Sequence, residues 1–197
     1  MPDYNITELD ISKQGLTKLP NDIDKYSNLK KLNCLGNQIT NLYNLPPNLE
    51  ILYCDDNQIT SLYNLPPNLE ILHCRNNKIT SLDNLPAKLE KLFCDDNKIT
   101  SLDNLPAKLQ VLHCRSNKIT SLDNVPLTLK ELICSYNEIT HLDNLPTKLE
   151  VLHCDYNNIT SLDNLNINLR FIWCYGNPLK YTFYPNLENI RKYNKQL

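Results

Sequence analysis

The stretch LEILYCDDNQITSLYNLPPN, residues 49–68, decides the fold, because close copies of it follow directly along the chain. Residues 69–88 read LEILHCRNNKITSLDNLPAK, and residues 89–108 read LEKLFCDDNKITSLDNLPAK. All eight cysteines keep this step of twenty residues, namely Cys34, Cys54, Cys74, Cys94, Cys114, Cys134, Cys154 and Cys174. A period this strict indicates a solenoid, in which each unit contacts only its neighbours.

The repeated unit reads L-x-x-L-x-C-x-x-N-x-I-T-x-L-x-N-L-P-x-x. Its first seven positions alternate between apolar and variable residues, which predicts a short strand with leucine and cysteine pointing into the core. Successive units would then stack these strands in parallel. The second half is too short and too rich in proline for a helix, so it predicts an extended or polyproline-like segment on the opposite side.

The unit also resembles the leucine-rich repeat, whose signature is L-x-x-L-x-L-x-x-N-x-L, here with cysteine in the third apolar position. The length of twenty residues and the Leu-Pro dipeptide are similar to the short repeats of secreted bacterial effectors and some giant-virus proteins. The resemblance covers nearly the whole chain. It implies an α/β-type, mostly β solenoid, curved like a horseshoe with a parallel sheet on its concave side, and a binding role.

The repeats predict a single domain over residues 1–197. Residues 1–28 are expected to form an N-terminal capping repeat, because this unit lacks both the cysteine and the asparagine. Regular repeats of twenty residues would fill residues 29–180. Residues 181–197 leave the pattern and predict a C-terminal cap, with a short closing helix over Pro185 to Tyr193.

Charge and hydropathy exclude two classes of partner. The formal net charge is -2 and the pI is near 6.1, so the chain has no electrostatic footprint for nucleic acid. The N-terminal residues MPDYNITELD resemble no signal peptide, and no window approaches the ~18 apolar residues of a membrane span. We therefore expect an intracellular protein, cytoplasmic in its own or in a host cell, that binds neither nucleic acid nor membrane.

No combination of residues predicts catalysis, a cofactor or a metal site. The chain has only three glycines, none in a phosphate-binding loop, and no serine lies at a plausible spacing from a base. His73, His113 and His153 share one column but lie two strands apart, about 10 Å along the ladder, which disfavours a shared metal. With one cysteine per unit there is no C-x-x-C pair, and inward cysteines predict buried free thiols. The recurring asparagine at position nine is expected to bond buried backbone groups at the turn.

The outward positions of the strands carry the candidate site. Position five is aromatic or imidazole almost throughout, with Ile133 as an interruption: Tyr53, His73, Phe93, His113, His153 and Trp173. Position seven alternates in charge over four units as Asp55, Arg75, Asp95 and Arg115, which predicts exposed pairs of opposite charge on adjacent strands. Aromatic residues and arginine are enriched in interface cores. The alternative is that aromatic residues merely suit strands and the charges are structural.

The sequence therefore predicts a non-catalytic module that binds a protein partner of unknown identity through these ten concave residues. The resemblance adds the expectation of a host-directed effector. The module itself is expected to be a monomer or to self-associate weakly. A structural or self-assembling repeat protein is the alternative that the sequence leaves open.

Overall fold

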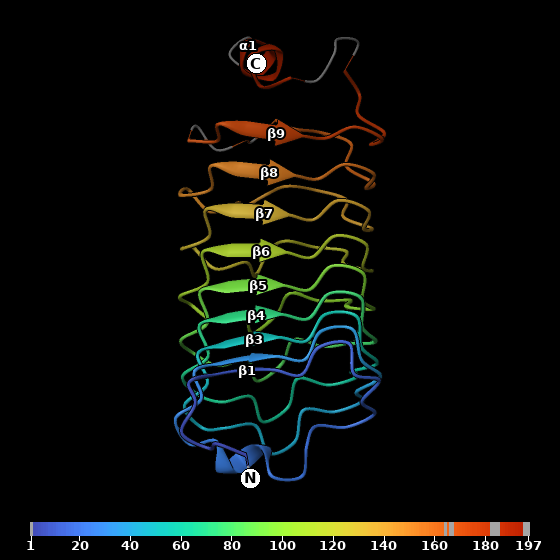
Figure 1. Cartoon of the computed structure of the whole chain (residues 1–197). Coiled ribbons are helices and arrows are strands. Elements are labelled where there is room, and N and C mark those ends of the chain that lie inside the picture. Colours follow the sequence, from blue (N-terminus) through green and yellow to red (C-terminus); the bar gives the residue numbers. More distant parts are fainter. Residues whose placement is uncertain (1, 164, 166–167, 182–185, 195–197) are drawn as a thin grey trace.

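The computed structural model describes residues 2–163, 165, 168–181 and 186–194. Nine strands of three residues each form one parallel sheet in the order of the chain (Figure 1). They are β1 (Glu8–Asp10), β2 (Lys31–Asn33), β3 (Ile51–Tyr53), β4 (Ile71–His73), β5 (Lys91–Phe93), β6 (Val111–His113), β7 (Glu131–Ile133), β8 (Val151–His153) and β9 (Phe171–Trp173). Among the described residues the helices are the 3-10 turn η1 (Ile23–Lys25) and α1 (Leu187–Asn194). The predicted mostly β solenoid is confirmed.

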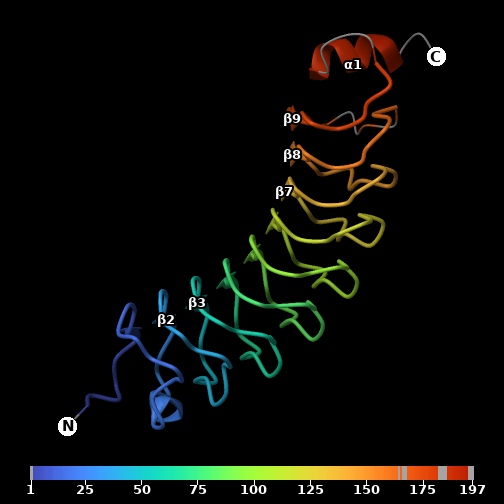
Figure 2. The same cartoon turned by 90° about the vertical axis from the view of Figure 1, so that its right-hand side faces the viewer.

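The sheet lies on the inner side of a curved molecule, and the turns of each repeat lie on the outer side (Figure 2). Neighbouring strands pair in strict register, so that Leu52 lies beside Leu72 and Tyr53 beside His73. Strands approach to hydrogen-bonding distance, about 4.8 Å, whereas side chains separate the turns opposite. This difference in spacing bends the stack toward the strands and produces the predicted concave sheet.

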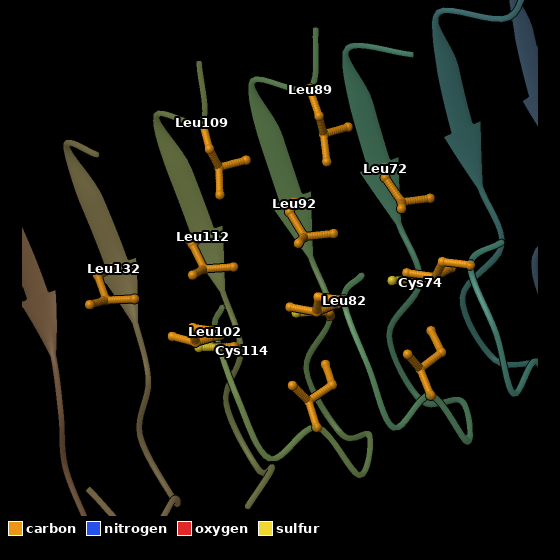
Figure 3. Packing of buried hydrophobic residues seen from close by; sticks show 14 of the residues in the cluster. Leu72, Cys74, Leu82, Leu89, Leu92, Leu102, Leu109, Leu112, Cys114 and Leu132 are labelled. Carbon is orange, nitrogen blue, oxygen red and sulfur yellow. The ribbon is translucent and has the colours of Figure 1, made fainter. Parts of the chain in front are cut away.

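The core is a continuous column of the same few side chains repeated from unit to unit. In the central unit Leu92, Cys94 and Ile99 have no exposed surface, and Leu102 has almost none. Figure 3 shows the strand leucines in a row from one strand to the next, with cysteines and a second set of leucines further along the repeats. The labelled members are Leu72, Leu92, Leu112 and Leu132 in the row, and Cys74, Cys114, Leu82 and Leu102 beyond it. Each fully buried leucine stabilises the fold by roughly 1.5–3 kcal/mol, and repetition makes this the main source of stability.

The cysteines form part of this column. All eight are buried and free, as the sequence predicted. Burial raises the pKa of both Cys34 and Cys174 to about 12, with nearby carboxylates adding to the shift. In the middle of the stack, burial likewise raises the pKa of the Cys94 thiol well above its ordinary value. The thiols therefore behave as small apolar groups.

A ladder of asparagines ties each repeat to the one before it. The Nδ2 group of Asn57 donates to the carbonyl oxygens of Cys34 at 3.0 Å, Cys54 at 3.2 Å and Asp55 at 3.0 Å. Its Oδ1 accepts the backbone N–H of Ile39 at 2.9 Å. The pattern recurs at Asn77, Asn97, Asn117, Asn137, Asn157 and Asn177. One amide thus bonds four backbone groups at the turn, which confirms the predicted role.

Helix α1 covers the last repeat beyond β9 (Figures 1 and 2). Asn186 caps its N-terminus by accepting the N–H of Asn189 at 2.8 Å. Ile190 is fully buried, and Arg191 donates to the carbonyl oxygen of Leu169 at 2.7 Å. The closing helix predicted over residues 185–193 is confirmed from residue 187 onward, whereas residue 185 and the side chain of residue 193 lie outside the described residues.

Candidate partner-binding site

The N-terminal half of the concave face carries a continuous stack of rings at position five. Because the strands are in register, ring centroids lie 4.7 Å apart between Tyr53 and His73, and 4.2 Å apart between His73 and Phe93. Phe93 and His113 follow at 4.8 Å, edge to face. These four predicted residues are half-buried against one another. The structure thus brings them together as a single surface.

Arg75 binds this stack to its neighbours. Its guanidinium lies 4.9 Å from the Phe93 ring centroid, and its Nε lies 2.8 Å from Oδ2 of Asp95. A second nitrogen, Nη2, lies 3.3 Å from Nδ1 of His113. His113 in turn places Nε2 at 2.8 Å from Glu131 Oε1. In this half of the face, the Arg75 guanidinium is therefore already paired with the Asp95 carboxylate and the Phe93 ring.

The aspartates at position seven differ from the prediction of exposed ion pairs. Asp55 is buried, and its Oδ1 accepts the backbone N–H of Arg75 at 2.6 Å. Asp95 accepts the N–H of Arg115 at 2.7 Å in the same way. The expectation of exposure is therefore wrong for Asp55, because its carboxylate turns toward the backbone of the next repeat. Only the Arg75–Asp95 contact is an ion pair of the predicted kind.

His73 stays neutral near pH 7 in this setting. Burial, together with the positive charge of Arg75, lowers the pKa of His73 to about 4. Burial also raises the pKa of the Asp55 carboxyl, against the effect of its hydrogen bond from Arg75. The 3.8 Å separation between His73 Nδ1 and Asp55 Oδ2 is therefore a polar contact rather than an ion pair at neutral pH.

The C-terminal half of the face is arranged differently, because Ile133 interrupts the column of rings. His153 and Trp173 form a second stack, with ring centroids 4.5 Å apart and planes within 7° of parallel. Trp173 is 55% exposed. Next to this stack the surface is hollowed by about 550 Å³, within the size range of ligand pockets. The hollow is lined by Arg115, Ile133, Ser135, Tyr136, His153, Asp155, Tyr156, Trp173 and Tyr175.

Sequence reasoning missed Tyr136 and Tyr156, which occupy position eight, just after the outward strand positions. Their rings stack at 4.4 Å, and the Arg115 guanidinium lies 4.6 Å from the Tyr136 ring centroid. Both have a left-handed backbone, with φ of 58° and 52°, which is unfavourable for a bulky side chain. Earlier and later repeats place glycine, aspartate, asparagine or serine there, at Gly36, Asp56, Asn76, Asp96, Ser116 and Gly176. Tyrosine at position eight in two repeats, where the other repeats have small or turn-forming residues, was the sequence signal that could have identified these residues.

Over the described residues, the histidine, cysteine, aspartate and glutamate side chains form no cluster of three that could hold a metal ion. The histidines of position five contact aromatic rings, and the cysteines are enclosed in the core. In the same part of the chain, no helix is both long and apolar enough to cross a bilayer. What the site offers chemically is aromatic surface, hydrogen-bonding groups and a few charges.

The in-register parallel strands, the leucine core and the asparagine ladder together define a leucine-rich-repeat solenoid. A family model described as leucine-rich repeats, in two copies, matches residues 47–87 and again residues 67–107. The chain thus folds as a leucine-rich-repeat solenoid with short repeats of twenty residues, and it is similar to this family over residues 47–107. None of the curated protein sequences matches the chain.

Several solved structures share this architecture. YopM from Yersinia enterocolitica WA-314 aligns with a TM-score of 0.84 and 32% identity, over 92% of this chain and 40% of that one. A Shigella effector leucine-rich-repeat domain aligns with a TM-score of 0.74 and 29% identity, over 88% and 82%. The functional domain of InlJ from Listeria monocytogenes, which includes a cysteine ladder, aligns with a TM-score of 0.70 and 32% identity, over 91% and 46%. The chain therefore spans less than half of the YopM and InlJ chains.

Proposed function

We propose that this chain is a non-catalytic protein-binding module whose concave aromatic face contacts the partner. The observation that carries the proposal is the exposure of large aromatic side chains in the C-terminal half of that face. Trp173, Tyr136 and Tyr156 are 55%, 43% and 52% exposed. Strand propensity accounts for the half-buried rings of the N-terminal stack. It does not account for Tyr136 and Tyr156, which lie outside the strands, or for the exposure of Trp173 at the end of β9. Exposed Tyr and Trp near a hollow are typical of interface hot spots.

The predicted set of concave residues enters this proposal with two changes. Tyr53, Phe93 and His113 supply half-buried rings, whereas Trp173 supplies an exposed one. Asp55 leaves the contact surface because it is buried and does not line the hollow. Tyr136 and Tyr156 join it. A face that runs along nine strands offers room for the ~800 Å² that one partner buries in a standard interface.

The proposal extends to the setting in which the module acts. The similar structures include a YopM described as a leucine-rich effector protein from Yersinia pestis and the Shigella effector domain. Eight buried free thiols suit a reducing compartment. We infer an effector that acts inside a host cell by holding a host protein.

Partner capture from an extract of the natural cellular setting tests the face. Trp173→Ala should weaken capture by more than about 1 kcal/mol, because the exposed indole contributes to contact rather than to the core. Phe93→Ala should weaken capture similarly, but it should also lower the melting temperature, since Phe93 is stacked between His73 and His113. Matched controls are Asp103→Ala and Lys108→Ala on the outer side of the repeat, which should bind as the wild type does.

Two results would contradict the proposal. Loss of partner capture with Asp103→Ala or Lys108→Ala, but not with Trp173→Ala, would place the contact on the convex side of the molecule. Self-assembly at micromolar concentration, measured by light scattering after size-exclusion chromatography, would favour the structural alternative instead.

A further inference from the structure

Asp155 is a buried carboxylate in the wall of the C-terminal hollow. It is 8% exposed. Its Oδ1 accepts the backbone N–H of Tyr175 at 2.9 Å, and its Oδ2 accepts the hydroxyl of Ser135 at 3.1 Å. Within the described part of the chain, no lysine, arginine or histidine nitrogen lies within 4.0 Å of it. Buried charges in proteins are normally paired, so this carboxylate lacks the counter-ion that its burial requires.

The pattern at position seven shows where that counter-ion is missing. In the N-terminal half, aspartate alternates with arginine, and Asp95 forms an ion pair with Arg75, whereas Asp55 accepts only the backbone N–H of Arg75. Asp155 instead lies between Ser135 and Tyr175. The alternation of charge therefore stops at Ser135, which lines the hollow.

The same chain shows what a completed arrangement looks like. Arg75 lies over the ring of Phe93 and pairs through Nε with Asp95 at 2.8 Å. The hollow contains an aromatic surface and a carboxylate, and the Arg115 guanidinium in its wall lies over Tyr136 without forming an ion pair with Asp155. Asp155 lines the same hollow as the His153–Trp173 stack and the Tyr136–Tyr156 stack.

We propose that this hollow receives an arginine side chain from the protein partner. The guanidinium pairs with Asp155, and its planar faces lie against the tyrosine and tryptophan rings. Arginine fits better than lysine because it combines stacking on aromatic rings with fork-like bonding to a carboxylate. Arg115, which lies over Tyr136 in the same hollow, shows that these rings accept a guanidinium. This inference rests on the proposed function, since it names the chemistry of the partner's contact.

Trp173 is the only tryptophan of the chain, so its fluorescence reports directly on the hollow. The probe is the blocked tripeptide Gly-Arg-Gly, titrated into the full chain. The matched control peptide has citrulline in place of arginine, which keeps the shape and removes the charge. We expect a saturable change with a Kd in the millimolar range for arginine and at least ~10-fold weaker binding for citrulline. A lysine tripeptide should bind with an affinity between those of the arginine and citrulline tripeptides.

Variants of the carboxylates provide the second part of the test. Asp155→Asn keeps the acceptor for the Tyr175 N–H and should abolish binding of the arginine tripeptide. The control is Asp55→Asn, which changes an equally buried aspartate outside the hollow and should leave binding intact. Ser135→Arg restores the alternation of charge beside Asp155. The Ser135→Arg variant should have a higher melting temperature than the wild type and should not bind the arginine tripeptide. This variant still tests the inference if Asp155→Asn does not fold.

An equal response to arginine and citrulline would overturn the inference, as would unchanged binding to Asp155→Asn or no saturable response up to about 50 mM. These results are distinguishable from failure of the proposed function. If the arginine peptide does not bind while Trp173→Ala still loses partner capture, the concave face is the contact and only its arginine chemistry is wrong.

Discussion

At the residue scale, the asparagine of position nine links repeats through a single amide. Asn97 donates to the carbonyl oxygens of Cys74 at 3.0 Å and Cys94 at 3.1 Å, and it accepts the N–H of Ile79 at 3.0 Å. Asn97→Ala leaves these groups unpaired and should lower the free energy of unfolding by about 1–3 kcal/mol. Urea denaturation measures this loss. The control, Lys98→Ala, changes an exposed side chain, and equal destabilisation by the two variants would refute the role assigned to the amide.

The thiols make a second prediction at this scale. Since all eight are buried, the native chain should react with few equivalents of Ellman's reagent, and denaturant should release most of the eight. Absorbance at the wavelength of the released thiolate counts them in both states. Rapid labelling of the native protein would show that the cysteine column is accessible, contrary to the structure.

At the scale of the element, the turn that ends each strand requires a left-handed residue at position eight. Gly176 has φ of 65°, and a Cβ added there would lie 2.5 Å from the Tyr156 ring. Gly36 has nearly the same φ of 68°, but its added Cβ would meet only the flexible side chain of Lys13 at 3.1 Å. Substitution of Gly36 therefore tests backbone strain alone, whereas substitution of Gly176 tests backbone strain together with a steric clash.

Gly36→Ala should therefore cost about 1 kcal/mol from backbone strain alone. Gly176→Ala should cost about 1–3 kcal/mol more, because its methyl group displaces the Tyr156 ring. Melting temperatures of the two variants measure the difference. Adding Tyr156→Asn to Gly176→Ala should recover most of the extra loss; if it recovers none, the ring is not the cause.

The same turns explain why the two halves of the concave face differ. Asp56, Asn76 and Asp96 suit a left-handed backbone and leave position eight without an aromatic side chain. Tyr136 and Tyr156 have that unfavourable backbone and project stacked rings beside the hollow. Such strain commonly persists at functional sites, which is consistent with a contact centred in the C-terminal half.

At the scale of the whole molecule, eight buried thiols should make stability strongly dependent on pH. Burial raises the pKa of every cysteine above its ordinary value of 9.0, to about 12 at Cys34 and Cys174. The unfolded chain therefore loses thiol protons near pH 9 while the folded chain keeps them. Stability from this source is complete below pH 9 and falls as pH rises, by up to about 1.4 kcal/mol per thiol and pH unit.

Urea midpoints at pH 7, 9 and 10 should consequently show a steep loss of stability above pH 9. Cys94→Ala removes one buried thiol, so the slope of unfolding free energy against pH should fall by the contribution of one proton. The control is Lys98→Ala, which keeps all eight thiols. Equal stability at pH 7 and pH 10 would contradict the thiol ladder as the source of the dependence.

The sequence by itself determined the inward half of this protein. Leucine, cysteine, isoleucine and asparagine recur at fixed positions, and a shift of one residue in a strand would turn its whole apolar set outward. Stacked parallel strands, a buried thiol column and an asparagine ladder therefore followed from the period alone. The closing helix was predictable because the pattern ends there, and the structure describes it over Leu187–Asn194.

Only the tertiary structure decided what the outward residues do, because the repeat does not constrain them to one environment. The rings of position five stack since register brings neighbours within 5 Å, yet Ile133 divides them into two stacks. Asp55 and Asp155 are buried because their carboxylates accept backbone N–H groups from the next repeat, a contact invisible along the chain. The hollow exists because the turns of two later repeats carry tyrosine rings toward it. Core positions obey a period, whereas surface positions depend on which neighbours the folded chain brings within reach.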